Sequence, residues 1–180
     1  MPHLSPIEHP KSLFLRVLYA YSRRRFGKVL TVMKIVYARQ PRLALLAQKV
    51  VQTQEKLSLE PSLRFLIQAK VSQLNGCAFC EDITLAQALQ KNIGLDRFRD
   101  LFDISNSTSF SPREKAALAF VEEATVARKV SEATWQQVRS YFSDTEIVEL
   151  TWLNASENYF NLQAAVLGIG SDCLAEGVAG

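Results

Sequence analysis

The chain lacks any long hydrophobic run: no stretch approaches the 18 or more consecutive apolar residues of a membrane-spanning helix. Its first ten residues contain three prolines and no apolar segment, so we expect no signal peptide and a cytoplasmic location. Glycine and proline are scarce, with seven and six in 180 residues, which leaves little room for linkers. We therefore expect a single domain over residues 1–180, large enough to bury a core without disulfide staples.

Cysteine and histidine are also scarce, with three and two residues respectively. An odd number of cysteines does not fit a secreted disulfide framework and favours a reducing compartment. The two histidines, His3 and His9, lie far along the chain from the cysteines and pair with nothing at metal-ligand spacing. The sequence therefore predicts no zinc site, and we expect no cofactor. Cys173, near the C-terminus, is interpreted as a spectator.

Positive charge is concentrated at the N-terminus. Residues 1–56 contain eleven Lys and Arg against two acidic residues, whereas the remainder contains ten against sixteen. Such an arm could bind an anionic surface, or pack on the acidic body within one chain or between subunits. Only Arg23-Arg24-Arg25 forms a cluster, and no nucleic-acid-binding motif accompanies it. We favour packing, and expect neither nucleic acid nor a membrane as a partner.

Strict alternation of apolar and polar residues, the pattern of a half-buried strand, is absent. The apolar spacing instead predicts an all-α bundle of about eight helices. Ser111, Ser131 and Ser143 mark helix starts, and Gly94 and Gly168 mark helix ends. The expected helical ranges are 11–21, 29–39, 41–56, 61–74, 77–92, a short segment 96–102, one helix from 112, 132–141 and 144–167.

The last long predicted helix has two different sides. One carries apolar residues at alternating spacings of four and three, which predicts a core or a subunit seam: Val148, Trp152, Ala155, Tyr159, Leu162 and Val166. The opposite side clusters Asn154, Glu157, Asn158 and Asn161. A solvated face is one interpretation of this cluster. Amides that hydrogen-bond internally, beside a pocket or across an interface, are the other, and both stay open.

Two of the three cysteines, Cys77 and Cys80, form a C-x-x-C pair directly after Asn75-Gly76. Asn-Gly favours a turn because both residues tolerate positive φ. We therefore expect both cysteines in the first turn of the next helix, where free N–H groups and the helix dipole stabilise a thiolate. Such a dithiol can reduce a hydroperoxide or a disulfide, one sulfur attacking and the other resolving the product. Two packed, inert cysteines are the alternative.

Four segments in this order resemble the carboxymuconolactone decarboxylase superfamily, in its alkylhydroperoxidase-D-like branch. They are residues 71–80 (VSQLNGCAFC), 111–120 (SPREKAALAF), 142–152 (FSDTEIVELTW), and 158–161 (NYFN) with 167–169 (LGI). The resemblance covers about residues 26–170 and leaves residues 1–25 as a basic N-terminal helical arm. It implies an all-helical fold that assembles into homo-oligomers, as a dimer, trimer or hexamer.

The resemblance also implies a chemistry for the cysteine pair. Cys80 is expected to attack a hydroperoxide or partner disulfide, and Cys77 to resolve the product, with a thiol protein or small thiol as reductant. The family's proton relay uses a glutamate and a histidine, whose positions hold Phe65 and Thr84 here. The chain also has leucine after Asn161, where many relatives have arginine.

These departures leave two hypotheses. The first is an oxidoreductase in which Thr84, Asn161 and Glu157 support the two cysteines in place of the relay. The second is a catalytically degenerate fold that binds a small molecule or serves as an oligomeric scaffold.

Overall fold

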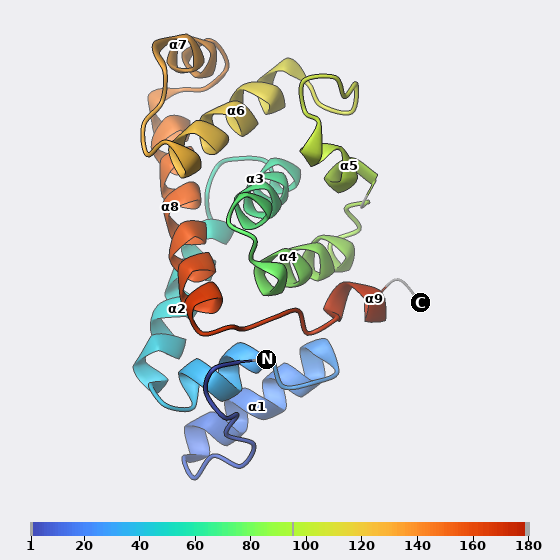
Figure 1. Ribbon diagram of the computed structural model, residues 1–180, viewed down its shortest axis with the longest axis vertical. Helices are drawn as coiled ribbons and strands as arrows, with labels where there is room; N and C mark the ends of the chain where they lie inside the picture. Colours follow the sequence, from blue (N-terminus) through green and yellow to red (C-terminus); the bar gives the residue numbers. More distant parts are fainter. Residues whose placement is uncertain (1, 95, 179–180) are drawn as a thin grey trace.

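The computed structural model describes residues 2–94 and 96–178, and these residues form helices and no strands (Figure 1). The all-α prediction is confirmed, with nine α-helices in the described ranges. They are α1 (Leu13–Phe26), α2 (Pro41–Glu55), α3 (Pro61–Leu74), α4 (Ala78–Gln90), α5 (Asp96–Arg99), α6 (Pro112–Val126), α7 (Glu132–Tyr141), α8 (Asp144–Val166) and α9 (Leu174–Val178), with a π-helix η1 (Met33–Tyr37) and a 3₁₀ turn η2 (Asp100–Phe102). No helix in these ranges is both long and apolar enough to cross a membrane.

Two groups of buried apolar side chains form the interior. The larger group lies among α3, α6, α7 and α8 and includes Leu66, Leu118 and Leu150. The smaller group joins α1, η1, α4 and the C-terminal segment, and it includes Tyr19, Ile35 and both paired cysteines. In Figure 1, α3 and α4 lie centrally, with α6 above them, α8 at the left and α1 below. The cysteine helix therefore contacts both groups.

Serine caps start the three helices α6, α7 and α8, as predicted. Ser111 and Ser143 each accept a hydrogen bond from the backbone N–H of the glutamate three residues later, whose carboxylate accepts one in return. Ser131 accepts from the backbone N–H of Thr134. These caps satisfy N–H groups that have no partner inside the helix, which explains why the helix starts could be read from short local sequences.

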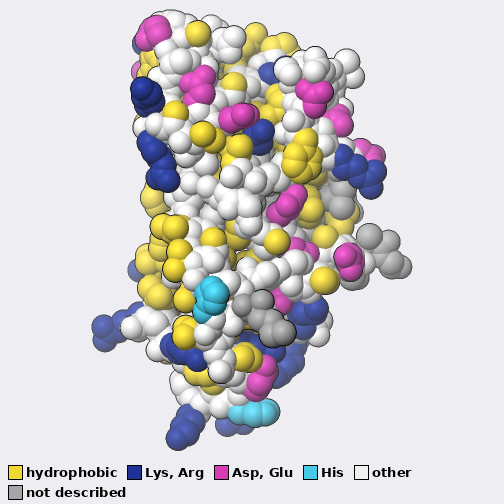
Figure 2. Space-filling model, in the orientation of Figure 1, with side chains coloured by type: hydrophobic (Ala, Val, Ile, Leu, Met, Phe, Trp, Pro, Cys, Tyr) yellow, Lys and Arg dark blue, Asp and Glu magenta, His cyan; other side chains and the backbone are white. Residues whose placement is uncertain are grey.

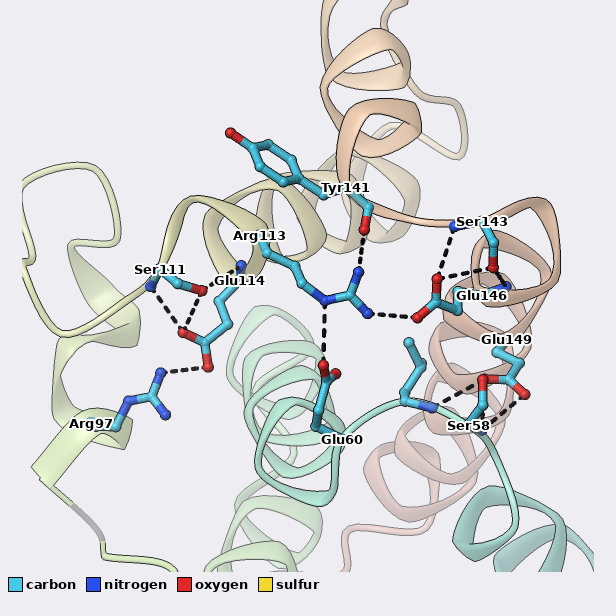
Figure 3. A network of polar contacts seen from close by, with 11 residues as sticks. Ser58, Glu60, Arg97, Ser111, Arg113, Glu114, Tyr141, Ser143, Glu146 and Glu149 are labelled. Atoms are coloured by element: carbon cyan, nitrogen blue, oxygen red, sulfur yellow. Dashed lines mark hydrogen bonds and ion pairs between the residues drawn. The ribbon is translucent and has the colours of Figure 1, made fainter.

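Arg113 connects three of these elements (Figure 3). Its guanidinium donates to the backbone carbonyl of Tyr141 and to the Glu146 carboxylate, and its Nε lies 3.4 Å from the carboxylate of Glu60. The guanidinium carbon also lies 3.9 Å from the centre of the Phe142 ring. One arginine thus ties α6 to the start of α3 and to the α7–α8 connection.

Three predicted helix limits are wrong. The first helix, expected over 11–21, runs five residues further and ends at Phe26. Gly94 does not end α4, because Asn92 already adopts a left-handed φ of 57° and the N–H of Ile93 bonds to the carbonyl of Ala88 at 2.9 Å. The segment expected at 29–39 is shorter and π-helical over Met33–Tyr37, with the N–H of Ala38 bonded five residues back to Met33. The short helix α9 was not predicted at all.

The apolar side of α8 lies on the surface, so its interpretation as core is wrong for this chain. Val148, Leu162 and Val166 are each about two-thirds exposed, at 66–67%, and Trp152 and Tyr159 are 40% and 37% exposed. Figure 2 shows apolar side chains gathered at the left edge, over α8 and α2, and basic ones at the lower end, over α1. The interior instead receives other α8 residues: Ile147, Leu150, Leu153, Asn154, Ser156, Glu157, Asn161 and Ala164.

Candidate dithiol site

The C-x-x-C pair lies at the start of α4, where the chain turns after α3. Gly76 adopts a left-handed φ of 62°, which glycine tolerates without steric cost and which directs the chain into α4. Cys77 is the N-cap and Cys80 the third helical residue, so only Cys80 lies inside the first turn. The two sulfur atoms are at disulfide distance, 2.21 Å, and Cys77 Sγ also accepts from the Cys80 N–H at 3.3 Å.

The two cysteines differ in what they face. Both are almost fully buried, with 3% of Cys77 and 4% of Cys80 exposed. Cys80, however, lines a cavity of about 140 Å³ whose walls come from α2, α3, α4 and α8, and Cys77 does not. The lining from α4 and its C-cap includes Cys80, Thr84, Gln87 and Lys91, spaced four, three and four residues apart. A small molecule in this cavity reaches Cys80 first.

The two positions of the family relay face the same cavity. Phe65 and Thr84 both line it, but an apolar ring and a hydroxyl cannot exchange a proton at neutral pH. Two carboxyl groups line the cavity, the exposed Glu55 at the end of α2 and the buried Glu157 of α8. Glu157 is the one held by hydrogen bonds inside the cavity wall. Its Oε1 accepts from the side-chain amides of Gln54 and Gln68, each at 3.1 Å.

Glu157 is only 6% exposed, and this burial dominates its titration. Desolvation raises the pKa of the carboxyl to about 7, while the hydrogen bonds from Gln54 and Gln68 lower it in part. Both protonation states are therefore populated near neutral pH. The sequence singled out Glu157 as part of an Asn-rich face, but the cavity beside Cys80 was not foreseeable from it.

The remaining amides of that face are internal, which excludes the solvated interpretation and confirms internal hydrogen bonding. Asn161 is fully buried, and its Oδ1 accepts from Asn75 Nδ2 at 3.0 Å. Asn75 Nδ2 also donates to Asn158 Oδ1 at 3.0 Å. These contacts attach the Asn75-Gly76 turn to α8. Asn161 does not line the Cys80 cavity, so it stabilises the turn that presents the cysteines.

Sequence reasoning missed the role of Asp82, two residues after Cys80. Its buried carboxylate accepts four hydrogen bonds from the C-terminal segment: from the Ser171 hydroxyl and from the N–H groups of Asp172, Leu174 and Ala175, at 2.7–3.0 Å. The negative charge of this carboxylate is thus engaged by donors at the start of α9. Cys173, between these donors, is exposed and unpaired among the described residues.

Comparison with known proteins identifies the class that this fold and site define. The model of the carboxymuconolactone decarboxylase family matches residues 41–123. The uncharacterized protein YnjA of Escherichia coli strain K12 is 30% identical over 161 residues, covering 88% of this chain and 86% of that protein. The chain belongs to the carboxymuconolactone decarboxylase family.

Solved structures show the same fold at low sequence identity. The debrominase Bmp8 superposes with a TM-score of 0.81 at 15% identity, covering 98% of this chain and 95% of that one. A peroxidase-related protein from Ralstonia eutropha JMP134, with an alkylhydroperoxidase AhpD core, gives 0.78 at 18% identity and covers 95% and 93%. The family name refers to a decarboxylase, whereas these two structures are a debrominase and a peroxidase-related protein. Since these names refer to different reactions, the fold and the family alone do not determine the reaction of this chain.

Proposed function

We propose that this protein is a thiol-dependent oxidoreductase that reduces small hydroperoxides with the Cys77–Cys80 pair. The observation that carries the proposal is that Cys80, at a helix start, is the cysteine of the pair that lines the cavity. The N-terminal turn of α4 offers backbone N–H groups and a positive dipole end, which favour a thiolate there.

The proposed cycle begins with the reduced pair. The Cys80 thiolate attacks one oxygen of the peroxide, the O–O bond breaks, and the other oxygen leaves as an alcohol after taking a proton. Cys80 then carries a sulfenic acid, which the Cys77 thiol attacks to form the disulfide and release water. Two thiols of a reductant return the pair to the dithiol state and are themselves oxidised to a disulfide.

Glu157 is the proposed proton carrier for this cycle. A carboxyl group with a pKa of about 7 can take the proton of Cys80 and deliver it to the departing alkoxide. Thr84, one turn after Cys80 on the same side of α4, is the proposed hydrogen-bond donor beside the sulfur. Asn161 acts indirectly, through the Asn75 turn. In this proposal a carboxyl group of α8 carries the proton that the family's relay would carry from positions 65 and 84.

Burial favours small reactants over a protein disulfide. Both sulfur atoms belong to residues that are no more than 4% exposed, and the entrance to Cys80 is a cavity of about 140 Å³. A small hydroperoxide fits this space, and a small thiol can regenerate the pair by the same entrance. We expect a folded partner to reduce it much more slowly.

A second copy of this chain is the proposed partner for the exposed side of α8. Val148, Trp152, Tyr159, Leu162 and Val166 form one stripe of large apolar side chains that the chain leaves in water. Their spacing of four and three is that of a helix seam, and a symmetric pairing of two α8 helices would cover both stripes at once.

The test compares three cysteine variants in single-turnover peroxide consumption. Cys80→Ser should lower the rate by about 10³-fold, because the attacking sulfur is removed. Cys77→Ser should keep the first turnover and accumulate a sulfenic acid that dimedone traps on Cys80. Cys173→Ser, at an exposed and unpaired cysteine, serves as the matched control and should behave as wild type.

An unchanged rate in Cys80→Ser would disprove the proposal. The same conclusion would follow if both thiols of the reduced protein alkylated only in denaturant. The fold would then act as a binding or scaffold protein, with the cysteine pair packed and inert.

A further inference from the structure

Arg64 presents unused hydrogen-bond donors in the cavity that Cys80 lines. Its Nη1 donates to the backbone carbonyl of Gln54. Its Nε–H is buried, and no described residue accepts a hydrogen bond from it. Nη2 donates to no described residue either, but it is not buried. Because a buried donor without a partner costs free energy, the buried Nε–H needs an explanation.

The unused edge has the geometry of a carboxylate receptor. Nε–H and Nη2–H of one guanidinium point in parallel and bind the two oxygens of a carboxylate together. Lys91 also lines the cavity, but its ammonium lies 3.9 Å from the carboxylate of Glu55. The other side-chain donors of the lining are neutral: Gln54, Gln68, Gln87 and Thr84. Arg64 is therefore the group that would anchor an anion there.

The other charged groups of the cavity allow one negative charge. Lys91 lies at the rim, 3.9 Å from the Glu55 carboxylate and 5.7 Å from the centre of the Phe65 ring. Glu55 is thereby partly neutralised. Glu157 is partly protonated at neutral pH, because burial raises its pKa to about 7. A monoanion fits this balance better than a phosphate dianion, which both carboxyl groups would repel more strongly.

The helical hairpin sets the distance between Arg64 and the reactive sulfur. Gln73 donates to Glu81 beside the Asn75-Gly76 turn, and Phe65 lies against Lys91, so α3 and α4 run antiparallel. Arg64 therefore lies at the Gln87–Lys91 end of the cavity. Gln87 is seven residues beyond Cys80 on the same side of α4, which corresponds to about 10 Å along the helix. Val51, Phe65 and Ile83 supply apolar wall to the cavity between these ends.

From this geometry we infer that the cavity binds a monocarboxylate with an apolar body, its carboxylate on the Nε/Nη2 edge of Arg64 and its far end at Cys80. In terms of substrate, this is an organic hydroperoxide whose peroxide lies about 10 Å from a carboxylate. The peroxide end of this inference rests on the proposed function. The carboxylate end rests on Arg64 and the cavity alone.

Calorimetric binding of octanoate to the oxidised protein tests the carboxylate end without any turnover. Octanoate should bind wild type, and Arg64→Gln should weaken binding at least 10-fold, since paired charge-assisted hydrogen bonds are lost. Arg64→Lys keeps the charge but not the parallel donors, and we expect it to bind several-fold more weakly than wild type. Arg24→Gln, at an exposed arginine of α1, is the matched control and should bind as wild type. Circular dichroism identifies any variant that fails to fold.

Kinetics then test the substrate class. The ratio of kcat/KM for a carboxylate-bearing hydroperoxide to that for tert-butyl hydroperoxide should fall about 10-fold in Arg64→Gln. Arg64-dependent octanoate binding without peroxide turnover would support the anion site and overturn the proposed oxidoreductase. Turnover with no octanoate binding, or with equal binding to wild type and both Arg64 variants, would overturn the inference and leave the oxidoreductase intact.

Discussion

The two ends of the molecule are built by different means. At one end, α6, α7 and α8 start at serine caps with side-chain hydrogen bonds and bury a continuous apolar core. At the other, α1, α2 and α3 start without a capping side chain, and α2 and α3 line a cavity together with α4 and α8. Stabilising devices and reactive groups thus occupy different regions of one small fold.

Buried polar side chains occur at both ends, including Thr125 and Thr134 in the capped helices, but the buried carboxyl with a raised pKa lies at the cavity. Gln54, Glu157 and Asn161 are each less than 8% exposed, and all three lie in or beside the cysteine region. Each is hydrogen-bonded, which offsets the cost of burial. Because burial raises the pKa of Glu157 to about 7, ionisation of this carboxyl group above neutral pH still destabilises the folded state. We infer that the capped end contributes stability to the fold, whereas the buried carboxyl group beside the cysteines reduces it.

Leu150→Ala should produce the largest loss of stability. Leu150 is fully buried in the large core, so its truncation removes apolar burial and leaves a cavity, a cost of about 4 kcal/mol. Leu162→Ala is the matched control: the same residue type in the same helix, but 67% exposed, and we expect a change of less than about 0.5 kcal/mol. Urea unfolding at low protein concentration measures both.

The exposed leucine has its own readout at high concentration. If α8 pairs with α8 of a second copy, Leu162→Ala weakens self-association in analytical ultracentrifugation while the stability of the dilute protein is unchanged. Equal destabilisation by the two substitutions in dilute solution would contradict the assignment of the inner and outer sides of α8.

Glu157→Gln should raise stability at alkaline pH while it lowers activity. Glutamine keeps the hydrogen bonds from Gln54 and Gln68 but cannot ionise. The unfolded chain releases the Glu157 proton near pH 4.5 and the folded protein near pH 7, so rising pH favours unfolding between these values. That interval corresponds to about 3 kcal/mol, all of it lost above pH 7 in wild type.

Denaturant titration at a series of pH values measures this effect. The gain from Glu157→Gln should be near zero at pH 4 and about 3 kcal/mol at pH 8. In the same variant, the pH profile of peroxide turnover should lose its ionisation near pH 7. A gain of the same size at pH 4 and pH 8 would show that Glu157 is already ionised in the folded protein at low pH.

The same division separates what the sequence could predict from what it could not. The capped helices were predictable because the serine that caps each start, with a glutamate three residues later in α6 and α8, lies within a few residues of the helix it begins. The turn before the cysteines was predictable for the same reason. The residues that share the cavity with Cys80 could not be predicted. Glu157 comes from α8, which is distant in the sequence, and Arg64 comes from α3, and only the packing of these helices on α4 brings both side chains to the cavity.

Helical periodicity alone also left the direction of α8 undecided. It separated an apolar side from an amide side, but which of them faces inward depends on α3 and α6, which pack against the helix. The interior takes Leu150 and Leu153 together with the polar side of α8. Asn75 and Thr125 are hydrogen-bond partners of its amides, and Gln54 is a partner of its carboxylate. The apolar stripe is left outside.

Substitution of single N-cap serines should give the smallest changes in the free energy of unfolding. It compares directly how much one cap stabilises each end of the molecule. Ser143→Ala deletes the acceptor for the Glu146 N–H at the start of α8 and should cost about 1 kcal/mol. Ser12→Ala, at the N-cap of α1, deletes no capping hydrogen bond and should cost less than about 0.5 kcal/mol. Chemical denaturation of both variants at pH 7 measures the difference. A larger loss from Ser12→Ala would mean that the basic N-terminal helix depends on its cap more than the capped end does, and the division between a stabilising end and a reactive end would fail.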